Sequence, residues 1–175
     1  MPRFAANLSF LYTDLPFPER FAAAARDGFQ AVEYLFPYEH EVETLARLLK
    51  ENGLQQALFN APPGNWEAGE RGLAALPGRE AEFLQGIECA LQYARALDCP
   101  RIHVMAGLKP VTTNTLACWQ QNLLQSTTLA AEAGVQILIE PINNRDMPGY
   151  LLDSLDTAEA LLEHNPALKL QLDLY

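Results

Sequence analysis

Six polar side chains occupy similar places along this chain, each at the end of a short apolar run. They are Asn7, Glu33, Asn60, His103, Glu140 and Asp173. Carboxylates and imidazoles can move protons, amides can orient hydroxyl groups, and carboxylate oxygens can hold a divalent cation. Structural interpretations stay open, because Glu140 could pair with Arg145, His103 could be a buried core histidine, and the asparagines could stabilise turns.

The spacing of these six residues indicates a common location. Within each apolar run the side chains alternate with a period of two, so one face is apolar and the other ends on the polar residue. In a barrel of parallel strands such residues converge on one mouth. In an open, doubly wound sheet the ligand contacts gather at a single switch point instead. Six polar ends on six strands favour the barrel.

Alternating strands and helices must position these residues. We expect strands at Arg3–Phe10, Phe29–Phe36, Leu54–Asn60, Arg101–Met105, Val135–Glu140 and Leu168–Tyr175. We expect helices at about Pro18–Asp27, Glu41–Asn52, Glu80–Leu97, Thr115–Ala133 and Ser154–His164. This alternation predicts βαβ units, a parallel sheet and the α/β class.

The length of the chain limits the size of the barrel. A unit of strand and helix takes about 33 residues here, whereas an eight-stranded barrel needs about 250 residues or more. We therefore expect residues 1–175 to form a single partial (β/α)₈ TIM-barrel domain with strands one to six, without strands seven and eight. The structural alternative is a complete, open six-stranded α/β fold.

Composition narrows the function classes. With 12 Lys and Arg against 22 Asp and Glu, the net charge is −10, which disfavours nucleic acid and anionic membranes as partners. No apolar stretch is long enough to span a membrane, and the N-terminus lacks the pattern of a secretory signal. The three cysteines contain no Cys-x-x-Cys pair and are expected to be reduced. These features predict a cytoplasmic protein.

The polar segment from Ala61 to Gly78 is long for a connection between a strand and a helix, and such loops are usually functional or disordered. Its Arg71, and Arg79 just after it, could bind a substrate carboxylate, because a guanidinium can hold a carboxylate with two hydrogen bonds. Both arginines could equally be solvated loop charges. Trp66 could be a hydrophobic lid or an anchor for the loop.

Five segments carry a resemblance to a known family. In chain order they are PRFAANLS, VEYLFPYE, APPGNWEAGERGLAALPGRE, IEPIN and LQLDLY. Together they resemble the hydroxypyruvate isomerase family, which includes 2-oxo-tetronate isomerases and belongs to the xylose-isomerase-like barrels. The likeness extends over essentially all 175 residues. It implies a TIM barrel that binds a divalent metal, Mg²⁺ or Mn²⁺, and interconverts hydroxypyruvate with tartronate semialdehyde, or a 2-oxo-tetronate homologue.

The resemblance also implies roles for individual residues. Family members hold the metal at the ends of strands five to eight; the strand-five glutamate corresponds to Glu140 and the strand-six aspartate to Asp173. Glu140 would bind metal and move a proton, and Asp173 would only bind metal. The remaining ligand and the second proton-transfer glutamate have no counterpart before Tyr175, so we expect weak or no metal-dependent isomerase activity from the 175 residues. The residues implied to line the mouth and orient the substrate are Asn7, Glu33, Asn60 and His103.

Two other interpretations stay open. The chain could be a catalytically dead, truncated remnant, or another enzyme of the same superfamily such as a sugar epimerase. An apurinic endonuclease is disfavoured, because it needs a basic face and more histidine ligands than the three histidines here. An open barrel leaves the edges of its first and sixth strands unpaired, so we expect the isolated chain to form a homo-oligomer or to cover these edges against a partner.

Overall fold

Residues 2–108 and 112–173, which the computed structural model describes, contain six parallel strands in one sheet whose order follows the sequence. The strands are β1 (Ala5–Asn7), β2 (Ala31–Tyr34), β3 (Gln55–Asn60), β4 (Arg101–His103), β5 (Gln136–Ile139) and β6 (Lys169–Leu170). The strand order is β1-β2-β3-β4-β5-β6, with no reversal. A doubly wound sheet reverses its order at the switch point, so this topology is that of a barrel.

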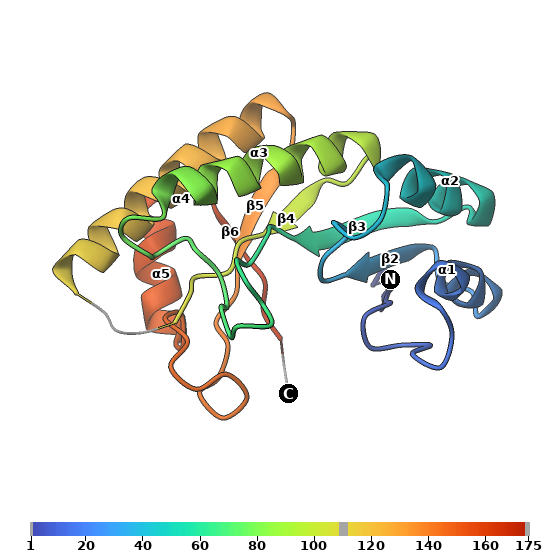
Figure 1. Ribbon diagram of the computed structural model, residues 1–175, viewed down its shortest axis with the longest axis horizontal. Coiled ribbons are helices and arrows are strands. Elements are labelled where there is room, and N and C mark those ends of the chain that lie inside the picture. Colours follow the sequence, from blue (N-terminus) through green and yellow to red (C-terminus); the bar gives the residue numbers. More distant parts are fainter. Residues whose placement is uncertain (1, 109–111, 174–175) are drawn as a thin grey trace.

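The helices lie on one side of this sheet. They are α1 (Phe17–Arg26), α2 (Val42–Asn52), α3 (Glu80–Ala96), α4 (Thr113–Glu132) and α5 (Leu155–His164). Figure 1 shows them following one another in an arc around the strands, and α1 packs against α2, α2 against α3, and α3 against α4. The α/β barrel prediction is thus confirmed in an incomplete form, because within the described residues β1 and β6 each pair on one side only.

The core lies between the sheet and the helices. Its largest fully buried side chains include Phe21 of α1, Phe59 of β3, Ile87 of α3 and Ile139 of β5. Burial of each such side chain stabilises the fold by about 1.5–3 kcal/mol. Strand residues of one parity supply this core, which leaves the other parity free for the inside of the barrel.

Short-range signals fix where several helices begin and end. Thr112 and Thr115 form a reciprocal capping box at the start of α4. The hydroxyl of Ser154 accepts a hydrogen bond from the Thr157 amide at the start of α5. Gly53 ends α2 in the left-handed region, with φ of 63°. The predicted helices agree with the observed ones to within two residues at each end for this reason.

Two predicted strands are wrong in extent. After Asn7 the chain turns, because the Asn7 carbonyl accepts hydrogen bonds from the amides of residues 10 and 11. Phe4 and Phe10, expected on the apolar face of a strand, are 72% and 67% exposed. The last predicted strand is only β6, and Leu172 beyond it is 52% exposed. Residues 174 and 175 of that prediction lie outside the described residues.

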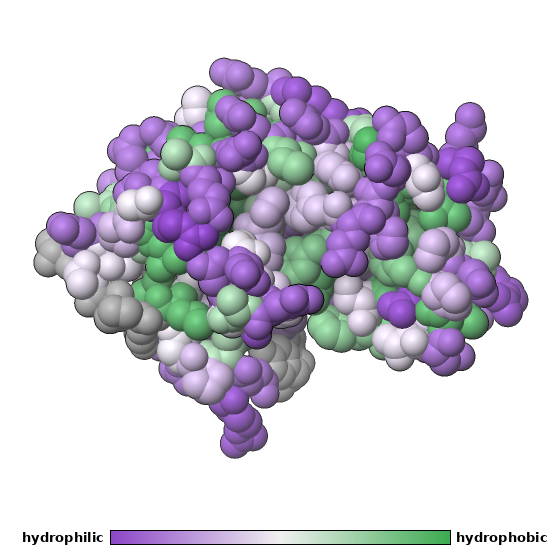
Figure 2. Space-filling view, viewed as in Figure 1, coloured by the Kyte–Doolittle hydropathy of each residue, from purple (hydrophilic) through white to green (hydrophobic). Residues whose placement is uncertain are grey.

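Hydrophilic residues cover much of the surface, with hydrophobic residues visible between them (Figure 2). None of the described helices combines the length and the apolar character that a membrane span requires. The helices thus pack one face on the sheet and expose the other face to water.

Candidate functional site

One cavity of about 360 Å³ lies at the C-terminal ends of the strands. All six polar strand-end residues line it, and they come from six different strands or the residues that follow them. They are Asn7, Glu33, Asn60, His103, Glu140 and Asp173. The structure therefore brings together every member of the set that alternation placed at the strand ends. Their catalytic and binding roles stay predictions.

The sheet register explains this convergence. Parallel pairing aligns Asn7 with Glu33 and Asn60 with His103. The register between β2 and β3 shifts after Val32, and this irregularity sets Glu33 opposite Leu58, which also lines the cavity. Because side chains alternate across a strand, aligned residues at the same end point to the same side.

Asn7 and Glu33 form a hydrogen-bonded pair. The Asn7 side-chain amide donates to Glu33 Oε1 at 3.0 Å, while the Asn7 Oδ1 atom accepts from the amide of Ser9 at 3.0 Å. Burial raises the pKa of Glu33, the hydrogen bond from Asn7 lowers it, and the charge of Asp173 raises it again. Asn7 thus fixes both the chain turn after β1 and the orientation of a half-buried carboxyl group.

His103 is held as a neutral imidazole. Its side chain is only 2% exposed, and burial lowers its pKa to about 4. Its Nδ1 atom lies 3.2 Å from Asn60 Oδ1. An amide oxygen can only accept, so Nδ1 carries the proton and Nε2 has a free lone pair. Nε2 is buried, has no hydrogen-bond partner among the described residues, and lies 3.8 Å from Glu140 Oε2.

Glu140 lies among other acidic groups. It is 8% exposed, and its pKa is raised to about 8, mainly by burial and then by Asp173 and Glu33. A hydrogen bond with Gln171 acts in the opposite direction and lowers the pKa. Three carboxyl groups near one another cannot all carry charge cheaply, so either a proton or a cation must compensate part of it.

Arg71 and Arg79 do not line this cavity. Arg79 forms ion pairs with Glu70 at 2.7 Å and with Glu82 at 2.5 Å, so its guanidinium already binds two carboxylates. Arg71 donates to the carbonyl oxygens of Trp66 and Glu70. The structure therefore does not bring these two arginines into the cavity with the six strand-end residues, and their binding of a substrate carboxylate stays a prediction.

Several lining residues were absent from the sequence prediction. Gln171 belongs to this group, although it shares the parity of Asp173 and the alternation could have found it. Ile142, Asp146 and Met147 come from the segment after β5, which carries no periodic pattern that could place them. Trp66 also lines the cavity, which gives the long loop a direct part in the site.

The donor set fits a divalent cation only in part. Glu140 and Asp173 are hard oxygen ligands of the kind that Mg²⁺ and Mn²⁺ prefer. Asp173 raises the pKa of Glu140 because the two negative charges repel each other, and a bound cation would reduce this repulsion. Within residues 2–108 and 112–173, no three His, Cys, Asp or Glu side chains are arranged to hold a metal ion. Two ligands are therefore available, and the full shell is not formed by the described residues.

A small polyhydroxylated molecule in this cavity would meet amides, a neutral imidazole and carboxyl groups together. Amides and the imidazole can orient hydroxyl and carbonyl groups. A carboxyl group whose pKa lies near neutrality can take a proton and return it. Such a site can move protons between neighbouring carbon atoms.

Comparison with known proteins identifies relatives along the whole chain. Residues 21–175 match the xylose isomerase-like TIM barrel family. The 2-oxo-tetronate isomerase of Cupriavidus necator is 56% identical, over 100% of this chain and 69% of the relative. The hydroxypyruvate isomerase of Escherichia coli is 40% identical, over 100% of this chain and 70% of the relative. A crystal structure described as AP endonuclease, family 2, from Brucella melitensis has a TM-score of 0.97 and 45% identity, over 100% of this chain and 69% of that one.

Proposed function

Since this chain belongs to the xylose isomerase-like TIM barrel family, we propose that it is a sugar-acid isomerase. The proposed reaction interconverts hydroxypyruvate and tartronate semialdehyde, or the corresponding pair derived from 2-oxo-tetronate. Two relatives aligned over the full chain bear the names of these activities. The observation that supports the proposal best is the buried Glu140 in a cavity lined by polar ends of all six strands.

The reaction moves protons without any change in the number of electrons or atoms. One proton leaves C3 of hydroxypyruvate, one proton arrives at C2, and the hydroxyl proton on O3 passes to O2. The C3 hydroxymethyl group becomes an aldehyde, while the C2 carbonyl becomes a secondary alcohol. A proton-transfer group must reach both carbon atoms, and other groups must hold the two oxygens.

Glu140 takes the proton from carbon in this proposal. As a carboxylate it is a stronger base than an ordinary glutamate, because its pKa is raised by burial and by Asp173. His103 Nε2 accepts a hydrogen bond from a substrate hydroxyl, and Asn7, Glu33 and Asn60 orient the remaining oxygens.

We further propose that Glu140 and Asp173 hold a divalent cation, Mg²⁺ or Mn²⁺. When bound, such an ion polarises the carbonyl and hydroxyl oxygens of the substrate. The proposal is supported by the mutual repulsion of the two carboxyl groups and by their oxygen chemistry.

The name of the Brucella melitensis structure does not lead us to propose cleavage of nucleic acid. Among the described residues, the cavity is lined by Glu33, Glu140, Asp146 and Asp173 and by no lysine or arginine. A phosphate backbone binds through positive charge and would be repelled by this lining.

The proposed function is tested by incubating the chain with hydroxypyruvate or the four-carbon 2-oxo acid in D₂O with Mg²⁺ or Mn²⁺. Proton NMR follows both the appearance of the aldehyde and the incorporation of deuterium. We expect weak turnover with the chain, and a further loss of at least about 100-fold in Glu140→Gln, because general acid–base groups contribute that much.

Glu163→Gln is the matched control, since Glu163 is an exposed glutamate of α5 and does not line the cavity. Its rate should equal that of the unchanged chain. Absence of turnover with both acids, or full activity of Glu140→Gln, would overturn the proposed function.

A further inference from the structure

Trp66 lines both the candidate site and a second cavity. The second cavity has a volume of about 330 Å³, and Tyr34, Leu35 and Trp66 line both cavities. Tyr34 and Leu35 lie at the end of β2, so they are fixed by the sheet. Trp66 is the part of the shared wall that the loop after β3 contributes.

The indole of Trp66 is packed on two sides. The Phe36 ring lies with its centroid 5.1 Å away at an interplanar angle of 60°. The guanidinium carbon of Arg71 lies 3.8 Å from the centre of the indole ring, which is cation–π distance. Arg71 Nη1 also donates to the carbonyl oxygens of Trp66 at 3.0 Å and Glu70 at 2.7 Å. Arg71 therefore holds both the ring and the backbone of the same residue.

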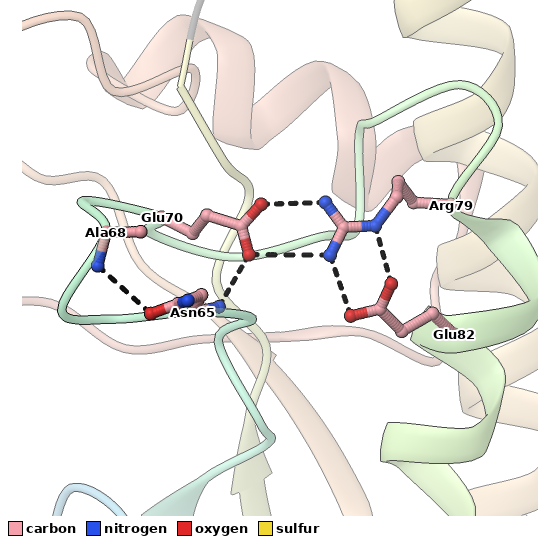
Figure 3. A network of polar contacts seen from close by, with 5 residues as sticks. All are labelled: Asn65, Ala68, Glu70, Arg79 and Glu82. Carbon is pink, nitrogen blue, oxygen red and sulfur yellow. Dashed lines mark hydrogen bonds and ion pairs between the residues drawn. The ribbon is translucent and has the colours of Figure 1, made fainter.

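An ion network ties this loop to α3. The Glu70 carboxylate accepts a hydrogen bond from the backbone amide of Asn65 and forms an ion pair with Arg79 at 2.7 Å. Arg79 also donates two hydrogen bonds to Glu82 in the first turn of α3. Figure 3 shows the Arg79 guanidinium between the two carboxylates. Glu70 lies next to Arg71, so the network ends at the residue that holds Trp66. The exposed fractions of Arg79 and Glu70 are 35% and 26%, which makes this a partly shielded network rather than a fully solvated pair.

We propose that Trp66 sets the maximum length of the acid that the site accepts, with Arg71 and Arg79 as positioning residues that keep the indole in the wall. The inference rests on the proposed sugar-acid function and adds its selectivity. Removal of the indole would join the two cavities. The polar side chains that line the second cavity, and that a longer acid would then reach, are Ser9, Arg20, Glu39 and His40.

The length limit is tested by calorimetric binding of unreactive acids in the presence of Mg²⁺. The probes are glycerate, erythronate and arabinonate, which have three, four and five carbon atoms. We expect arabinonate to bind the unchanged chain at least about tenfold more weakly than erythronate, a usual discrimination for one chain unit. In Trp66→Ala the two dissociation constants should come within about twofold of each other. Trp66→Phe retains a ring in the wall and should keep most of the discrimination.

The positioning role is tested by fluorescence in a Trp119→Phe background, where Trp66 is the one remaining tryptophan of the sequence. We expect Arg79→Ala to increase acrylamide quenching of Trp66 at least about twofold and to weaken length discrimination. Arg79→Lys should restore part of both effects. Arg47→Ala is the matched control, because Arg47 forms an exposed ion pair with Glu51 on α2, away from the loop.

The outcomes separate this inference from the proposed function. Tight binding of the short acids with an unchanged length ratio in Trp66→Ala refutes the length limit alone. Failure of the unchanged chain to bind either short acid refutes the proposed function and the length limit together. Equal quenching in Arg79→Ala and the unchanged protein refutes the positioning role, and circular dichroism of each variant verifies that it is folded.

Discussion

Glu140 illustrates how a single buried side chain can link chemistry to stability. Its folded-state pKa of about 8 lies above the usual value of 4.5, mainly because of burial and then because of Asp173. Between these two values the folded chain binds a proton that the unfolded chain has released. Raising the pH through this interval therefore lowers the free energy of unfolding.

Glu140→Gln should remove this dependence, because glutamine does not ionise. We expect the variant to gain melting temperature relative to the unchanged chain at pH 8.5 and to show little difference at pH 5. Thermal unfolding followed by circular dichroism, with EDTA present to exclude divalent cations, measures both. A difference between the two proteins that stays constant from pH 5 to pH 8.5 would contradict the expectation.

At the residue scale, the sequence predicted the members of the cavity better than their partners. Alternation alone brought Asn7, Asn60 and Glu140 to one place, because the period of a strand decides which side a residue faces. The same reasoning could not show that Arg79 is held by Glu70 and Glu82, since that contact depends on how an aperiodic loop folds back. Gln171 was overlooked even though its parity matched.

Among the elements, the loop after β3 depends on one close backbone approach. Gly72 has φ of +112°, and a Cβ atom there would press against the carbonyl group of Met105, just beyond β4. Gly69 in the same loop has φ of +93°, but a Cβ atom there would have no heavy atom within 4 Å. The two glycines share an unusual backbone conformation and differ in the space around them.

Substitution of each glycine by alanine separates backbone strain from steric conflict. We expect Gly69→Ala to lower the free energy of unfolding by about 1–2 kcal/mol through strain alone. Gly72→Ala should cost at least about 1 kcal/mol more, because it also overpacks the contact with Met105. Urea unfolding of both variants measures the difference, and equal costs would show that the close approach does not exist in solution.

Helices were easier to predict than strand ends. The start of α5 follows from Ser154 and the end of α2 from Gly53, because caps are local in sequence. The alternation around β1 continues through Phe4 and Phe10, although the strand is shorter. Apolar alternation indicates which face a residue takes, but it does not state where pairing with a neighbour stops.

For the molecule as a whole, the two unpaired edges of the sheet are the surfaces that bear most on association with other chains. In the described residues, β1 pairs only with β2 and β6 only with β5. Exposed apolar side chains lie next to these edges, among them Phe4 at 72% and Leu172 at 52%. Unpaired edges with apolar neighbours favour association with another chain.

We accordingly expect the isolated 19.4 kDa chain to self-associate in solution. Phe4→Lys should shift the population toward monomer, because a charged residue beside an edge opposes strand pairing. Light scattering coupled to size exclusion measures the mass. Leu124→Lys serves as the control, since Leu124 is an exposed apolar residue of α4 away from both edges. A stable monomer of the unchanged chain would contradict the expectation.

The barrel fold could be predicted from the sequence because polar residues recur at the ends of the six strands. Such recurrence needs no knowledge of contacts between distant residues. The outline of the cavity could not be predicted from the sequence, since Trp66 and Met147 reach the cavity from loops whose paths depend on packing.

The strictly sequential strand order also has a consequence for how the chain acquires its structure. In the part of the chain that the structure describes, every strand pairs only with the strands before and after it, so each new unit finds a partner that has already been synthesised. Folding can then proceed from the N-terminus while the ribosome is still adding residues. Each intermediate would expose one unpaired strand edge, and the rate of translation would determine how long that edge remains unpaired.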